Sequence, residues 1–224
     1  MKVDPEDIMR IRVTLSMAAA IVVPLLACGC GPHSSTAINP IAHPQPVAHQ
    51  SVPAGPGPTG TYTVQPQPAP GSCHYGKSAS GEPLPDANCT PGATNPKVTA
   101  DNVKSTICVG GYTKSIRPPE EITSREKSAN AKSYGYTGSP HDAEYDHLIS
   151  LELGGDPNDP RNLWVEPPSP GHKAGSGPNN PKDSVENQLH SLVCSGKVGL
   201  TDAQSAIAGD WTTAMATVGH PGGK

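Results

Sequence analysis

Two short apolar segments separated by a tight turn constrain the fold more than any other feature of this chain. The first segment, residues 144–153, is rich in leucine and isoleucine and has the length of a strand. It ends at Gly154-Gly155, and Asn162 opens a second, similar segment. A helical pattern follows at residues 181–194. The order strand, loop, strand, helix therefore predicts a ββα unit within an α+β domain that has flanking helices.

Further helices are expected around this unit. A short helix near residues 99–108 is stopped by a Gly-Gly pair, and a longer one opens with the capping-box pattern of Thr123 and Glu126. Between them, residues 112–116 have the character of a brief extended piece. Small and apolar residues at helical spacing predict a last helix over residues 201–216.

The composition limits the size of the core. Of 224 residues, 27 are proline and 24 are glycine, and phenylalanine is absent. One modest domain is therefore expected rather than two. The formal net charge of −4 is not that of a strongly basic nucleic-acid-binding protein. From Lys97 onward, 12 Lys/Arg stand against 15 Asp/Glu, which predicts weak affinity for any nucleic acid.

The N-terminus has the pattern of an export signal over residues 1–27. A basic start is followed by an apolar run that is too short for an ordinary membrane span. Acidic residues precede Met9, so Met9 is a candidate initiator. The tetrapeptide Leu-Leu-Ala-Cys that ends at Cys28 resembles the bacterial lipobox, which predicts a lipid anchor in the cell membrane. A plain signal cut near Cys28, followed by secretion, is the alternative.

The rest of the chain divides by composition into three parts. Residues 28–72 are rich in proline and glycine, nearly uncharged and without apolar periodicity, so we expect a disordered tether there. Residues 73–96 contain two cysteines among turn-forming residues and are expected to be a loop region held by a disulfide. Residues 97–224 carry the predicted helices and strands and form the expected folded domain.

Four cysteines lie in or beside the folded part: Cys73, Cys89, Cys108 and Cys194. None belongs to a C-x-x-C pair, so disulfides, and with them an extracytoplasmic location, are favoured over a zinc site. Four cysteines permit three connectivities. The pair Cys108–Cys194 is preferred because both residues lie near the ends of predicted helices, which leaves Cys73–Cys89 to close a local loop.

The candidate chemistry centres on Asp146 and His147, an acid and a histidine side by side on the first strand. Hydrolysis of a phosphodiester requires an activated water and a counter-charge for the leaving oxygen. A neutral histidine can be the base, and hard oxygen ligands can hold Mg²⁺. The alternative is structural, with Asp146 capping a turn, His147 hydrogen-bonded in a half-buried strand and Asn162 serving as a turn residue.

Three sequence blocks, in this order, resemble the HNH or His-Me finger endonucleases, and in particular a group of exported actinobacterial proteins. The blocks are D-H-L-I-x-L-E-L-G-G from Asp146, N-L-W-x-E-P from Asn162 and K-D-x-x-E-N-x-L-H-x-x-V-C from Lys182. The resemblance runs from about Leu84 to Trp211. It implies a small ββα-metal core and a nuclease domain over residues 97–224.

The resemblance also implies roles for individual residues. His147 matches the general base, Asp146 the metal-binding acid, and Asn162 the residue that orients the base through its backbone or side chain. The metal ligand on the helix is left open. Its candidates are Asn179, Asn187 and His190, with Glu186 in a supporting role.

The expected function is that of an exported, metal-dependent endonuclease that hydrolyses DNA, RNA or both. Mg²⁺ is the expected ion and Mn²⁺ an alternative. Nucleic acid is the expected partner, with the membrane as a second one if Cys28 is acylated, and no protein partner is inferred. The competing hypothesis is a cell-surface lipoprotein that binds a partner or a wall component without catalysis. The excess of acidic over basic residues favours this second hypothesis.

Overall fold

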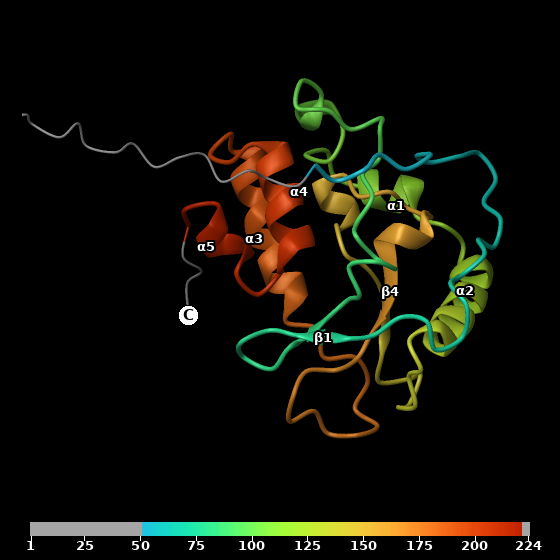
Figure 1. Ribbon diagram of the computed structural model, residues 1–224. Helices are drawn as coiled ribbons and strands as arrows, with labels where there is room; N and C mark the ends of the chain where they lie inside the picture. Colours follow the sequence, from blue (N-terminus) through green and yellow to red (C-terminus); the bar gives the residue numbers. More distant parts are fainter. Residues whose placement is uncertain (1–50, 221–224) are drawn as a thin grey trace, which may run out of the picture. The chain divides into compact units, whose positions relative to one another are not determined.

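The structure is a computed structural model that describes residues 51–220 and has the predicted mixed α+β character (Figure 1). The signal at 1–27, Cys28 and the tether residues 28–50 lie outside the described residues. The helices are α1 (Tyr112–Ile116), α2 (Glu120–Ser133), α3 (Lys182–Cys194), α4 (Leu200–Gly209) and α5 (Ala214–Thr217). The strands are β1 (Gly76–Lys77), β2 (Pro83–Leu84), β3 (Glu144–His147) and β4 (Leu163–Glu166). Three 3₁₀ turns complete the order: η1 (Val103–Ser105), η2 (Leu151–Leu153) and η3 (Pro160–Asn162).

The antiparallel pair β3–β4 lies at the centre of the described chain, with α2 on one side and the α3–α4 helices on the other (Figure 1). Its register pairs Asp146 with Trp164 and His147 with Leu163. The α2 helix is fixed to β4 by Asn130, whose side-chain oxygen accepts the Val165 N–H at 2.8 Å. The order strand, loop, strand, helix is thus present in β3, β4 and α3.

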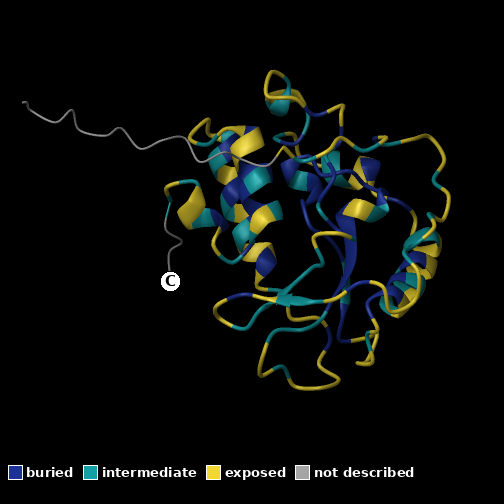
Figure 2. Ribbon diagram, viewed as in Figure 1, coloured by how far each residue is buried: buried dark blue, intermediate teal, exposed yellow. Residues whose placement is uncertain are grey.

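The main apolar core lies between α3, α4 and the loop after β3. Leu189 and Val193 of α3 pack with Leu200 and Ile207 of α4 and with Leu153. These positions fall on one face of each helix, and Figure 2 shows the buried faces turned toward the centre of the fold. Burial of one such side chain contributes roughly 1.5–3 kcal/mol, so this small cluster is a principal source of stability.

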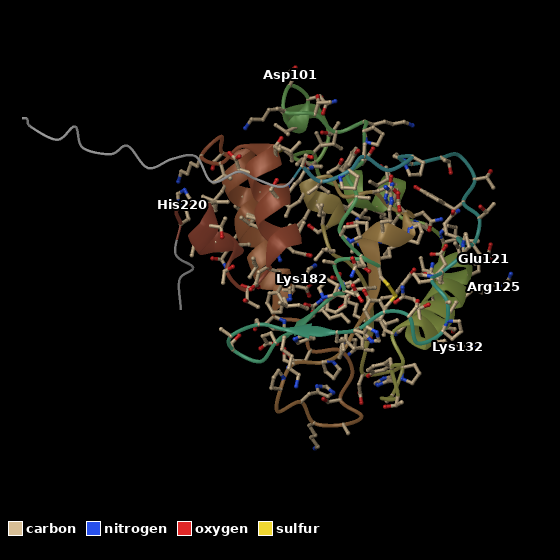
Figure 3. The ribbon with its side chains drawn as sticks, in the orientation of Figure 1. Asp101, Glu121, Arg125, Lys132, Lys182 and His220 are labelled. Atoms are coloured by element: carbon tan, nitrogen blue, oxygen red, sulfur yellow. A yellow bond between two sulfur atoms is a disulfide. The ribbon has the colours of Figure 1, made fainter. Side chains whose placement is uncertain are left out.

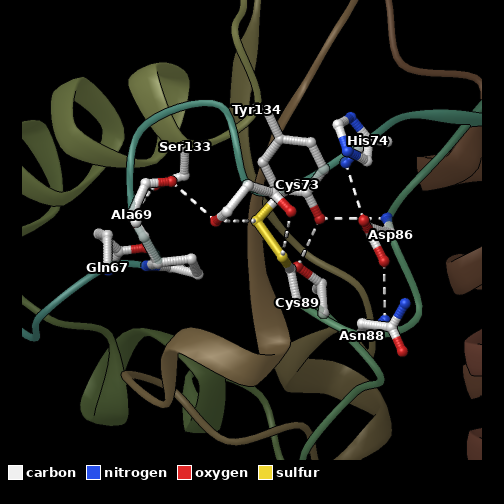
Figure 4. Close-up of a disulfide and its surroundings, with 12 residues drawn as sticks. Gln67, Ala69, Cys73, His74, Asp86, Asn88, Cys89, Ser133 and Tyr134 are labelled. Atoms are coloured by element: carbon white, nitrogen blue, oxygen red, sulfur yellow. Dashed lines mark hydrogen bonds between the residues drawn. A yellow bond between two sulfur atoms is a disulfide. The ribbon is translucent and has the colours of Figure 1, made fainter.

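Both preferred disulfides are present. Cys73–Cys89 joins residues 16 apart in sequence and lies beside Tyr134 and Trp164, in a second, smaller core. Beside it, the Asp86 N–H donates to the Tyr134 hydroxyl at 3.1 Å (Figure 4). The second disulfide, Cys108–Cys194, spans 86 residues and ends at the last residue of α3.

Two disulfides are typical of proteins that fold in an oxidising, extracytoplasmic compartment. None of the helices described between residues 51 and 220 is long and apolar enough to cross a membrane.

The tether prediction does not hold for residues 51–72, which run along the folded domain and bond to it. The Gly57 N–H donates to Asp156 Oδ2 at 2.6 Å, and the Gln65 N–H donates to Glu126 Oε1 at 2.7 Å. Proline fixes its own φ and so lowers the entropy lost on ordering. The segment is therefore held by backbone hydrogen bonds without needing apolar periodicity.

Several short elements differ from their prediction. The expected helix near 99–108 is only the turn η1, and residues 112–116 form the helix α1 instead of an extended piece. The α2 helix begins at Glu120, directly after Pro119, so Thr123 caps nothing and Glu126 bonds to Gln65 instead. The last expected helix is divided between α4 and α5, because the backbone at Asp210 is extended. The first predicted strand ends at His147, and η2 follows it.

Candidate active site

His147 is the last residue of β3 and is buried at 5% relative exposure. Its Nε2 lies 3.0 Å from the carbonyl oxygen of Pro157. Because a carbonyl oxygen only accepts hydrogen bonds, Nε2 carries the proton and Nδ1 holds the lone pair. The structure thus fixes one tautomer of this histidine, with a basic nitrogen at Nδ1.

The surroundings of His147 keep its imidazole neutral. Burial lowers its pKa to about 4, while the hydrogen bond to Pro157 and the charge of Asp146 oppose the shift in part. The positive charges of Arg117 and Lys182 lower the pKa further. At neutral pH the imidazole is therefore uncharged, and Nδ1 keeps its lone pair.

His147 lines a cavity of about 260 Å³. The other lining residues are Arg117, Pro118, Glu120, Thr123, Tyr145 and Leu163. Arg117 also lines a neighbouring cavity of about 230 Å³ that includes Glu186 and Asn187. The guanidinium of Arg117 makes no hydrogen bond or ion pair with the residues described, so the cavity combines a neutral base with a cation that can meet an anionic substrate.

Among the residues described, no hydrogen bond joins Asn162 to His147, but Asn162 fixes the loop that holds this histidine. Its side-chain oxygen accepts the Ile149 N–H at 3.0 Å, and its side-chain nitrogen donates to the carbonyls of Ile149 and Asp156, each at 3.0 Å. The side-chain amide of Asn162 therefore forms hydrogen bonds to both ends of the loop between β3 and η3. Since Asp156 directly precedes Pro157, Asn162 positions the carbonyl that accepts from His147.

The tight closure of this loop explains the Gly-Gly pair. A Cβ at Gly155 would lie 1.8 Å from the carbonyl oxygen of Ile149, a backbone atom that cannot move aside. Gly154 has φ +72°, a conformation that side chains disfavour. Glycine at both positions is therefore what allows Asn162 to reach across the loop.

Asp146 forms an ion pair with Lys182, the first residue of α3. The ammonium nitrogen of Lys182 donates to Asp146 Oδ2 at 2.7 Å, to the His147 carbonyl at 2.8 Å, and to the carboxylate of Glu186. The Lys182 side chain is 0% exposed, and it lies where α3 begins (Figure 3). Strand β3 and helix α3 are thus joined through one buried cation.

A third acid, Glu166, completes this group. Burial raises its pKa well above the usual range, and the negative charge of Asp146 raises it further. Glu166 lies diagonally across the β3–β4 pair from Asp146, on the same face, so the two carboxyls are neighbours.

The charge of Lys182 persists despite its burial. Burial alone would lower its pKa, but the carboxylates of Asp146, Glu186 and Glu166 together raise it above the ordinary value. For Glu186, burial raises the pKa, and the nearby ammonium opposes that shift. The group formed by Asp146, Glu166, Lys182 and Glu186, here termed the Lys182 cluster, therefore holds a permanent cation.

None of the three candidate helix ligands contacts Asp146 among the residues described. Asn179 is exposed and precedes α3. Asn187 is exposed, and its side chain donates to the Asp183 carbonyl at 2.8 Å. His190 lies near the other end of the helix, with Nε2 2.9 Å from the Ile107 carbonyl.

His190 also lies close to Cys108 and Cys194, within the distances that a shared metal ion would require. The two sulfurs are joined to each other in a disulfide, however, and the free thiolate is the form that binds metals. This Cys-His-Cys group is therefore not a metal site while the disulfide is intact.

A divalent ion at Asp146 does not fit the residues that the structure places there. The carboxylate is bonded to a buried ammonium, and Glu186, the helix residue on the same side, bonds to that ammonium as well. A second cation at this position would meet the charge of Lys182 at short range. We therefore derive no catalytic step through a metal at Asp146.

Two members of the Lys182 cluster, Lys182 and Glu166, had no role predicted from the sequence. Lys182 and Glu186 are an i,i+4 pair, a spacing that usually marks a solvated contact on a helix surface. Glu166 belongs to the second sequence block, but only the strand register places it beside Asp146. Arg117 gave no signal beyond its position before two prolines.

Comparison with known proteins adds no assignment: the chain matches no protein-family model, no curated protein and no solved structure.

Proposed function

We propose that the chain is an extracytoplasmic phosphodiester hydrolase of the nuclease class, with His147 as its general base. The observation that carries the proposal is the state of His147: one tautomer, neutral at pH 7, in the wall of a cavity that also contains Arg117. The strand, loop, strand, helix order and the resemblance of the three sequence blocks to HNH endonucleases support the same reaction class.

In the proposed reaction, the scissile phosphate enters the cavity and pairs with Arg117. Arginine suits this role because its planar guanidinium can bond two phosphate oxygens at once. A water molecule then attacks phosphorus while Nδ1 of His147 takes its proton, and the bond to the leaving oxygen breaks as that oxygen takes a proton from solvent. Asn162 keeps the Pro157 carbonyl in place, so that the proton on Nε2 stays where it is.

The location and the substrate class of the proposal have separate support. Two disulfides agree with a protein that acts outside the cytoplasm. An anchor at Cys28 remains part of the proposal and concerns a residue outside the described ones. DNA, RNA or both are the proposed substrates, with low affinity because acidic residues outnumber basic ones.

The test is a cleavage assay on the full chain with its disulfides intact. Plasmid DNA and RNA are incubated with the parent and with His147→Gln, in Mg²⁺, in Mn²⁺ and in chelator. Glutamine can still donate to the Pro157 carbonyl but cannot act as the base. We expect the variant to lose roughly 10²- to 10⁴-fold in rate, the usual contribution of general base catalysis.

The matched control is His74→Ala, which removes an exposed histidine that does not line the cavity. It should cleave at the parental rate, and thermal unfolding should show that His147→Gln is folded. Cleavage by His147→Gln at the parental rate would refute the role of His147. A parent that cleaves neither substrate under any condition would refute the nuclease and favour the non-catalytic surface protein.

A further inference from the structure

The position beside Asp146 already contains a cation. The Lys182 ammonium is 2.7 Å from Asp146 Oδ2 and also bonds to the Glu186 carboxylate. Its side chain is 0% exposed, whereas those of Asp146 and Glu186 are each 10% exposed. A fully desolvated ammonium is retained only where paired acids compensate for the lost hydration, and here three carboxyl groups surround it.

The third hydrogen bond of Lys182 links the cluster to the proposed base. Nζ donates to the backbone carbonyl of His147 at 2.8 Å. The ammonium therefore holds the end of β3 against the first turn of α3. A metal ion bound by a strand acid and a helix residue would connect the same two elements.

We infer that the Lys182 ammonium takes the place of a divalent ion at Asp146, so that this position is closed to metals in the native protein. Asp146 is then a positioning residue that holds Lys182, and Lys182 positions the strand that carries His147. The catalytic part of this inference rests on the proposed function. The part that concerns metal binding does not, because its readouts measure no cleavage.

The first measurement uses the unaltered full chain. Crystals soaked in MnCl₂ are examined for anomalous scattering from manganese. We expect no peak within coordination distance of the Asp146 carboxylate. A peak bonded to Asp146 would overturn the inference, whether or not the protein cleaves nucleic acid.

The second measurement removes the resident cation. Lys182→Ala leaves Asp146, Glu166 and Glu186 facing the vacated space, and three carboxylates suit Mn²⁺. The melting temperature of this variant should rise by roughly 5–10 °C with Mn²⁺ at ~100 times its Kd. The parent, and the control Lys197→Ala at an exposed lysine, should show no such rise.

A folded Lys182→Ala protein that gains no stability from Mn²⁺ would contradict the inference. If this variant fails to fold, the soaked crystals of the parent still show whether a metal binds at Asp146. Loss of cleavage in His147→Gln, by contrast, bears only on the proposed function, so the failure of one proposal can be told from the failure of the other.

Discussion

The two ends of α3 are attached to the rest of the domain in different ways. At its first residue, Lys182 is held by buried charges and hydrogen bonds to β3. At its last residue, Cys194 is joined covalently to Cys108, next to the apolar core of Leu189 and Val193. The first attachment depends on the protonation of its acids, whereas the second does not.

This difference separates the two tasks of the helix. The covalent and apolar end stabilises the fold and carries no proposed chemistry. The charged end lies beside the proposed base, where a buried ion pair gives a defined geometry at little net gain in stability over apolar packing. Variants at either end can therefore show whether the two tasks are separable.

The largest expected effect on stability follows loss of the long-range disulfide. Cys108→Ser with Cys194→Ser should lower the free energy of unfolding by about 4–5 kcal/mol, because the crosslink restricts a long loop in the unfolded chain. Removal of Cys73–Cys89, which spans 16 residues, should cost roughly 3 kcal/mol. Urea denaturation at two pH values measures both. Losses that change with pH would contradict a purely covalent attachment.

Lys182→Met should lower the free energy of unfolding by about 3–5 kcal/mol at pH 9, because it leaves buried carboxylates without their cation. The loss should shrink at pH 6, because burial raises the pKa of Glu186 to about 8 and this acid takes up a proton between the two pH values. Urea denaturation of this variant is compared with the exposed control Lys197→Met. An equal loss at both pH values would show that lost packing, and not lost charge, explains the effect.

A smaller effect is expected from His147 itself. Its pKa in the folded protein is about 4, below the value of about 6.5 in an unfolded chain. Between these values the unfolded state binds more protons, so the free energy of unfolding should fall by about 3 kcal/mol as the pH drops from 6.5 to 4. His147→Gln should lack this component, while His74→Ala should keep it. Equal pH dependence in the parent and in His147→Gln would contradict the burial of a neutral imidazole.

The sequence predicted those elements whose residues form a long periodic pattern. The α3 helix differs from its expected range by one residue, because its apolar stripe alone determines which face is buried. Short elements could not be predicted in this way. The helix at residues 112–116 has only five residues, too few to show a helical period, and residues 51–72 are ordered by partners far along the chain, such as Asp156.

The candidate site, too, could be predicted only in part from the sequence. Adjacent residues such as Asp146 and His147 are visible in the sequence, and Asn162 follows the turn that brings it close to them. The contact between Asp146 and Lys182 depends on the angle at which α3 meets β3. That angle cannot be predicted from the local sequence of either element. Each of the expected helix ligands was a plausible metal donor, yet none is the residue that reaches the acid.

The bonded course of residues 51–72 also has a consequence for the order in which this domain can fold as the chain emerges, N-terminus first, into an oxidising compartment. These residues are the first of the described domain to emerge, but their partners Ile116, Glu126 and Asp156 follow much later. Cys73 and Cys89 can meet early, whereas Cys194 must wait until nearly the whole chain is available. Residues 51–72 are therefore the first of the domain to be synthesised, but they can form their hydrogen bonds only late in folding.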